Sequence, residues 1–107
     1  MSCEEYAKYV IDNMYRASLP NALNIATSLV GDAKYNVNDF INHLITYVEL
    51  NIQNNKMDKM DAYRIIVYSK DCLDMYNSEF KYNKNMILDT YIINIWEVLH
   101  GYKVAQN

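Results

Sequence analysis

Glycine and proline are scarce in this sequence, which has two glycines and one proline among 107 residues. Sandwiches and barrels with many tight turns need more of both, so their scarcity favours long helices. The two glycines, Gly31 and Gly101, are too far apart to build either GxGxxG or GxxxxGK(S/T). The sequence therefore excludes a phosphate-binding loop of these types, and with it an NTPase activity of this chain.

Cysteine, positive charge and long apolar runs are also limited. Cys3 and Cys72 are too distant for a CxxC site and too few for a disulfide framework, so we expect reduced thiols in a cytoplasmic protein. The net charge of -3 provides no basic surface for nucleic acid. No apolar run approaches the roughly 18 residues that span a bilayer, and residues 1–5 carry no basic n-region. We expect neither direct nucleic-acid binding nor a membrane segment or signal peptide.

The residues that are present predict a folded helical domain. Hydrophobic residues make up 51% of the chain and charged residues 21%, the balance of a globular protein. Apolar positions recur at helical spacing in five segments, as where Tyr6, Val10 and Met14 follow one another every four residues. The length is that of one domain, 1–107. The fold class is therefore all-α, a single five-helix bundle with helices at about 3–15, 19–30, 37–53, 58–78 and 84–100.

Start and stop signals support these segments. Ser18 is a capping residue, and Pro20 in the following first turn gives up no intrahelical hydrogen bond. Asn36 and Asp58 are further capping residues before an apolar pattern. Glycine favours the left-handed conformation that ends a helix, so the second and fifth helices are predicted to stop at Gly31 and Gly101.

The last helix differs from the others in its pattern. Between Met86 and Leu99 apolar residues cover most of its circumference. A helix that is apolar nearly all round is enclosed by other helices. We therefore expect a hydrophobic C-terminal helix at the centre of the bundle.

Residues able to carry chemistry are few and do not form known patterns. His43 has no second histidine one turn away, and His100 in the last turn of its helix is better explained as a cap contact. The carboxylate pairs Asp58 with Asp61 and Asp71 with Asp74 have no ExxH partner of the kind used in di-iron bundles. We expect no catalytic residue, no cofactor and no metal site, and hence no enzyme.

Tyrosine is the abundant residue type, with eleven in the chain. Its side chain buries area while keeping a hydroxyl, and it is enriched at protein interfaces. Tyr47 and Tyr68 fall off the main apolar stripes of their helices, and ordinary partial exposure is the alternative explanation for them. The predicted interface residues are Tyr47, Tyr68, Tyr82 and Tyr102.

The order of helices resembles one known domain. The runs that carry the resemblance are Ala22-Leu23-Asn24-Ile25 through Leu29-Val30-Gly31, then Asn38-Asp39-Phe40-Ile41-Asn42-His43-Leu44, then 61–76, and Asn85-Met86-Ile87-Leu88. Together they look like the C-terminal collar domain of bacterial DNA polymerase III clamp-loader subunits of the gamma/tau or delta-prime type. Met86 and Tyr91 depart from residues common in that family, and the ATPase modules that precede a collar are missing.

The resemblance implies a role in assembly during DNA replication. In that family such domains pack into a ring that holds the ATPase modules together, so the partners would be other clamp-loader subunits. The family places no catalytic residue in this region. The alternative is a small stand-alone adaptor or inhibitor of phage or viral type, whose helical bundle binds one host protein.

Overall fold

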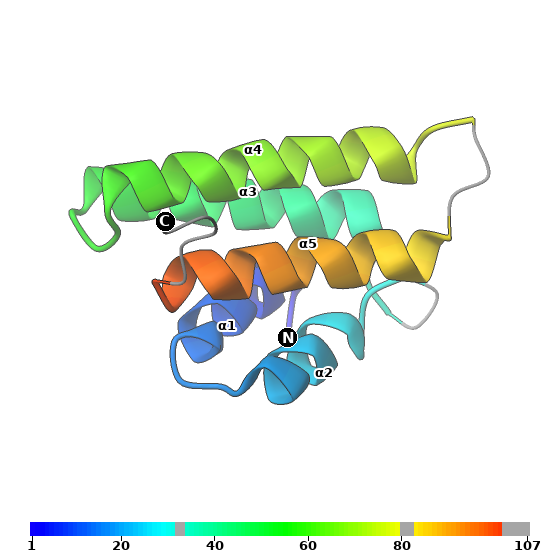
Figure 1. Cartoon of the computed structure of the whole chain (residues 1–107), viewed down its shortest axis with the longest axis horizontal. Helices are drawn as coiled ribbons and strands as arrows, with labels where there is room; N and C mark the ends of the chain where they lie inside the picture. The colour runs from blue at the N-terminus through cyan, green and yellow to red at the C-terminus, as the bar shows by residue number, and fades with distance from the viewer. Residues whose placement is uncertain (32–33, 80–82, 102–107) are drawn as a thin grey trace, which may run out of the picture.

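The computed structural model of the chain describes residues 1–31, 34–79 and 83–101, and within them the secondary structure is helical (Figure 1). This confirms the all-α fold class and the five-helix bundle. The helices are α1 (Cys3–Met14), α2 (Leu19–Thr27), α3 (Val37–Gln53), α4 (Lys59–Tyr76) and α5 (Lys84–Leu99).

Each helix begins at a polar side chain that accepts hydrogen bonds from its first turn. Ser18 caps α2, Asn36 caps α3 and Asp58 caps α4, as the sequence predicted. The cap of α1 was not among the predicted ones. There Ser2 Oγ accepts from Glu5 N at 3.1 Å while Ser2 N donates to Glu5 Oε1 at 2.9 Å, a capping box that the spacing S-x-x-E could have indicated.

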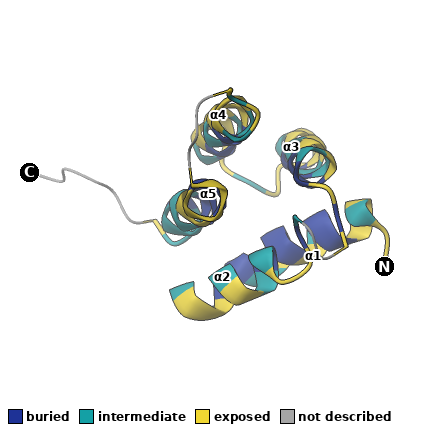
Figure 2. Ribbon diagram, turned by 90° about the vertical axis from the view of Figure 1, so that its right-hand side faces the viewer, coloured by how far each residue is buried: buried dark blue, intermediate teal, exposed yellow. Residues whose placement is uncertain are grey.

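The helices pack in a closed ring. α1 packs against α3, α3 against α4, α4 against α5, α5 against α2, and α2 against α1. Figure 2 shows α3, α4 and α5 end-on, with α1 and α2 lying across them. Figure 1 shows that α4 runs antiparallel to α3 and to α5, its neighbours along the chain.

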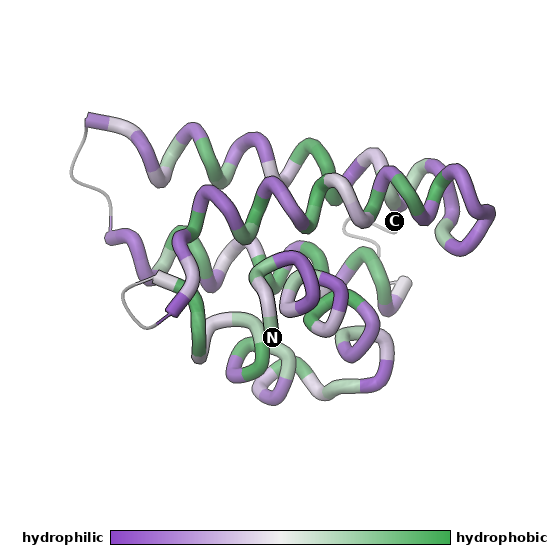
Figure 3. The backbone as a smooth tube through the Cα atoms, turned by 180° about the vertical axis from the view of Figure 1, so that it is seen from behind, coloured by the Kyte–Doolittle hydropathy of each residue, from purple (hydrophilic) through white to green (hydrophobic). Residues whose placement is uncertain are grey.

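The core lies inside this ring. Figure 3 shows hydrophobic and hydrophilic positions alternating around the turns of the helices, and the hydrophobic ones face the interior. The largest side chains that are almost completely buried come from all the helices except α2; they are Phe40, Ile11, Met14, Ile41, Leu44, Ile65, Ile92, Ile95, Val10, Val48 and Ser69. A radius of gyration of 13.2 Å is close to the about 13 Å expected for a compact chain of this length.

Two sequence predictions need correction. α2 ends at Thr27, three residues before its predicted end, because the next segment turns away. Tyr35 N donates to Leu29 O at 2.7 Å and Gly31 N donates to Tyr35 O at 2.8 Å, so Val30 and Tyr35 form a single bridge. Gly31 still has the positive φ of 93° that made it a candidate stop.

The position of α5 in the bundle also differs from the prediction. The helix is hydrophobic, as predicted, with Ile87, Leu88, Tyr91, Ile92, Ile95 and Val98 buried. It lies between α4 and α2, however, and is not enclosed on every side, since the Met86 side chain is 64% exposed and the neighbouring Asp89 and Thr90 are also exposed. Within the described ranges, none of the helices combines the length and the apolar character needed to cross a membrane.

Candidate protein-binding surface

An apolar groove with a volume of about 440 Å³ lies between α4 and α5. Antiparallel packing of the two helices brings the C-terminal half of α4 beside the N-terminal half of α5. The α4–α5 groove is lined by Tyr68, Asp71, Cys72, Met75, Asn83, Met86, Ile87, Thr90, Tyr91 and Asn94.

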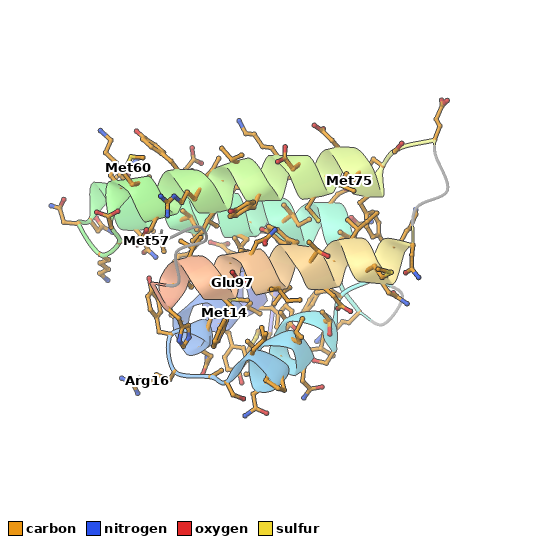
Figure 4. The ribbon with its side chains drawn as sticks, viewed as in Figure 1. Met14, Arg16, Met57, Met60, Met75 and Glu97 are labelled. Carbon is orange, nitrogen blue, oxygen red and sulfur yellow. The ribbon has the colours of Figure 1, made fainter. Side chains whose placement is uncertain are left out.

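Apolar side chains form both the floor and the rim of this groove. Cys72, Ile87 and Tyr91 are at least 93% buried beneath it, whereas Met75 and Met86 are 44% and 64% exposed beside it. In Figure 4, Met75 lies near the C-terminal end of α4 and Met60 near its N-terminal end. Methionine is flexible and polarisable, so exposed methionines around an apolar floor adapt to a partner's side chains.

Two buried hydroxyls meet below the floor. Ser69 Oγ donates to Ile65 O at 2.7 Å, and Ser69 Oγ and Tyr91 Oη are 2.6 Å apart. Because the single hydroxyl proton of Ser69 goes to Ile65, the Tyr91 hydroxyl is the donor in the second bond. Burial raises the pKa of Tyr91 well above its ordinary value, so this hydroxyl stays protonated and holds α5 to α4.

The cysteine thiol in the groove is kept in its unreactive form. Burial raises the pKa of Cys72 to about 11, and burial followed by the charge of Asp39 raises the pKa of Cys3. The thiolate is the nucleophilic form of cysteine, so neither thiol is activated at neutral pH. Asp71 is the one charged side chain among the groove-lining residues, which makes the groove a surface for apolar contact.

The two predicted interface tyrosines that the structure describes, Tyr47 and Tyr68, lie on different surfaces. Tyr68 is half-buried in α4 and lines the α4–α5 groove. Tyr47 is half-buried at the packing surface of α1 and α3, where its hydroxyl donates to Asp12 Oδ1 at 2.6 Å and Lys8 Nζ lies 6.0 Å from its ring centroid. Tyr82 and Tyr102 lie outside the described residues.

Burial, followed by the hydrogen bond with Asp12 and the charge of that carboxylate, raises the pKa of Tyr47 to about 12. The hydroxyl of Tyr47 is therefore engaged within the chain. The tyrosine interface stays a prediction, and Tyr68 is the member of it that lies beside an exposed apolar surface.

Two of the residues that the sequence offered for chemistry, His100 and Asp58, have structural contacts. His100 stacks on Trp96 with ring centroids 4.1 Å apart, and its Nε2 lies 2.7 Å from Met14 O at the end of α1. Asp58 caps α4 by accepting from Asp61 N at 3.1 Å. Among residues 1–31, 34–79 and 83–101, no three histidine, cysteine, aspartate or glutamate side chains lie together as metal ligands would.

Sequence reasoning missed the pairing of Met75 with Met86 on the groove rim. Each methionine is a single exposed apolar side chain of its own helix, and only the antiparallel packing of α4 and α5 places the two on one surface. Comparisons with protein-family models, with curated proteins and with solved structures found no match for this chain.

Proposed function

We propose that this chain is a non-catalytic helical assembly domain similar to the clamp-loader collar, acting in the cytoplasm by joining other protein subunits. The observation that carries the proposal is the α4–α5 groove, whose exposed methionines flank an apolar floor. Exposed apolar surface around a concave floor is typical of protein-binding sites. Because the order of the helices resembles that of the clamp-loader collar, we expect the partners to be clamp-loader subunits.

The test is native mass spectrometry of the full chain mixed with clamp-loader subunits from its own source. We expect a mixed complex of defined stoichiometry. If every clamp-loader subunit stays separate from the chain, the collar role is wrong, and a stand-alone adaptor for a different protein takes its place.

Two matched variants test whether the α4–α5 groove is the contact surface in the mixed complex. Met86→Lys places a charge on the groove rim and should weaken the mixed complex by about tenfold or more, because a desolvated apolar contact is lost. Leu50→Lys is the control, since Leu50 is 42% exposed on α3 and lies outside the groove. Equal binding by both variants would exclude the groove as the contact surface.

A further inference from the structure

The solvent-facing side of α4, away from the groove floor, carries a second exposed apolar surface. Met60, Tyr63 and Val67 are 60%, 47% and 56% exposed. Spacings of three and four residues place them on one side of the helix. Val67 stands near the middle of the 18-residue helix, so the three residues cover its N-terminal half up to its centre. We name this side the outer face of α4.

Exposed charges of both signs flank these residues, including Asp58 before α4 and Lys70 in its C-terminal half. Lys59 and Arg64 belong to the N-terminal half of α4, whereas Asp71 and Asp74 belong to the C-terminal half. The helix dipole stabilises negative charge at the N-terminus of a helix and positive charge at its C-terminus. It therefore does not stabilise Lys59 in the first turn or Asp74 in the last turn. In the described part of the chain the one ion pair joins Lys8 to Glu4, so these four charges form no ion pair there.

We propose that the outer face of α4 binds the same face of a second copy of this chain, with the two α4 helices antiparallel. In a two-fold dimer centred near Val67, a residue before the centre lies opposite a residue after it. Arg64 and Asp71 are seven residues apart and therefore share the edge of the outer face that borders the groove. The two-fold axis places Arg64 of each copy beside Asp71 of the other, which makes two ion pairs.

The opposite edge of the outer face is complementary in the same way. Tyr63 and Lys70 are also seven residues apart, so the antiparallel arrangement brings each Lys70 to the ring of a Tyr63. Val67 meets its own symmetry copy at the centre. A parallel pair would instead place Arg64 beside Tyr63 and Asp71 beside Lys70 of the other copy, so exchanging the charges of Arg64 and Asp71 distinguishes the two arrangements.

This inference goes beyond the proposed function, because it concerns another face and an identical partner. Sedimentation velocity of the full chain alone tests it. The apolar contact is small, so we expect a dimer with a dissociation constant on the order of 100 µM. A chain that remains monomeric at about 1 mM would overturn the proposal.

Charge reversal tests the antiparallel arrangement. Arg64→Asp alone and Asp71→Arg alone each place like charges together and should weaken the dimer by about tenfold or more. Mixed in equal amounts, the two variants should form a heterodimer, since each reversed charge then meets its opposite. If the wild-type chain dimerises and the mixture stays monomeric, the arrangement is wrong.

Two further variants separate the outer face from other surfaces. Val67→Lys should abolish the dimer, whereas Leu50→Lys on α3 should leave it unchanged. Both positions are exposed, so circular dichroism should report unchanged helix content. A dimer that survives Val67→Lys contradicts the proposal, and loss of the dimer leaves the separate test with clamp-loader subunits unaffected.

Discussion

Buried polar side chains in this protein have partners. In residues 1–31, 34–79 and 83–101, every buried side-chain nitrogen or oxygen takes part in a hydrogen bond. The pair of Ser69 and Tyr91 is the deepest example, with exposed fractions of 0% and 2%. A buried hydroxyl that loses its acceptor keeps its full desolvation cost, so the two members of this pair are not equivalent.

We expect Ser69→Ala to lower the free energy of unfolding by about 1–3 kcal/mol, because the Tyr91 hydroxyl is left buried without its acceptor. Tyr91→Phe should cost less, because Ser69 still donates to Ile65 O after the change. The double variant should be more stable than Ser69→Ala alone. Urea unfolding followed by circular dichroism measures all three, and a Ser69→Ala chain as stable as the wild type would contradict this account.

The raised pKa of Tyr47 predicts how the free energy of unfolding depends on pH. Its pKa is raised from 10.0 to about 12 in the folded chain, so the protonated form stabilises the fold. The sign follows from linkage: this contribution is fully present below pH 10 and is lost as the pH rises from about 10 to about 12. Near neutral pH, Tyr47→Phe should be less stable than the wild type, because the hydrogen bond with Asp12 is absent.

The measurement is the free energy of unfolding of both chains across the alkaline range. The difference between wild type and Tyr47→Phe should narrow as the pH rises through that window. Tyr63→Phe, which removes a tyrosine hydroxyl from the exposed outer face of α4, serves as the comparison variant. A constant difference for Tyr47→Phe would show that its hydroxyl does not couple to folding.

Most helices could be predicted from the sequence. Ser18, Asn36 and Asp58 marked helix starts because a capping side chain acts within three residues of its own position. The C-terminal end of α2 was not readable in this way. It depends on hydrogen bonds that Tyr35 makes with the residues around Val30, and such contacts across a loop leave no periodic signal.

The groove could not be predicted from either of its helices alone. Met86 was expected to be enclosed with the other apolar residues of α5, and single exposed apolar side chains such as Met75 and Met86 are common on protein surfaces. Likewise, the Trp96 side chain of α5 donates from Nε1 to Ala17 O at 2.8 Å, a contact between residues 79 positions apart. Sequence spacing reports which residues share a helix face, whereas the packing partner of that face is decided by the whole fold.

The closed ring of helices restricts how α5 can separate from its neighbours. α5 is held by α4 on one side and by α2 on the other, so it cannot swing away without breaking two packing surfaces. Cys72 on α4 is 3% exposed against α5, and its pKa of about 11 leaves little thiolate at neutral pH. Its thiol therefore reports the separation of α4 from α5.

In a chain carrying Cys3→Ser, we expect a thiol reagent to label Cys72 with an opening free energy equal to that of global unfolding. Labelling rates measured at increasing urea concentration give the comparison. A chain that keeps Cys3 and carries Cys72→Ser is the control and should label faster, because Cys3 is half-buried at the start of α1. Fast labelling of Cys72 in the absence of urea would mean that α5 opens locally.

The contact between α2 and α5 has a consequence for the order of events during synthesis. α2 leaves the ribosome before α3 and α4, and α5, one of the helices against which α2 packs, follows them. Helices α1, α3 and α4 can assemble on one another while translation continues, whereas α2 keeps part of its apolar side uncovered until α5 arrives. The nascent chain therefore carries a helix with part of its apolar side uncovered until α5 has been made, and this interval is when a chaperone would protect it best.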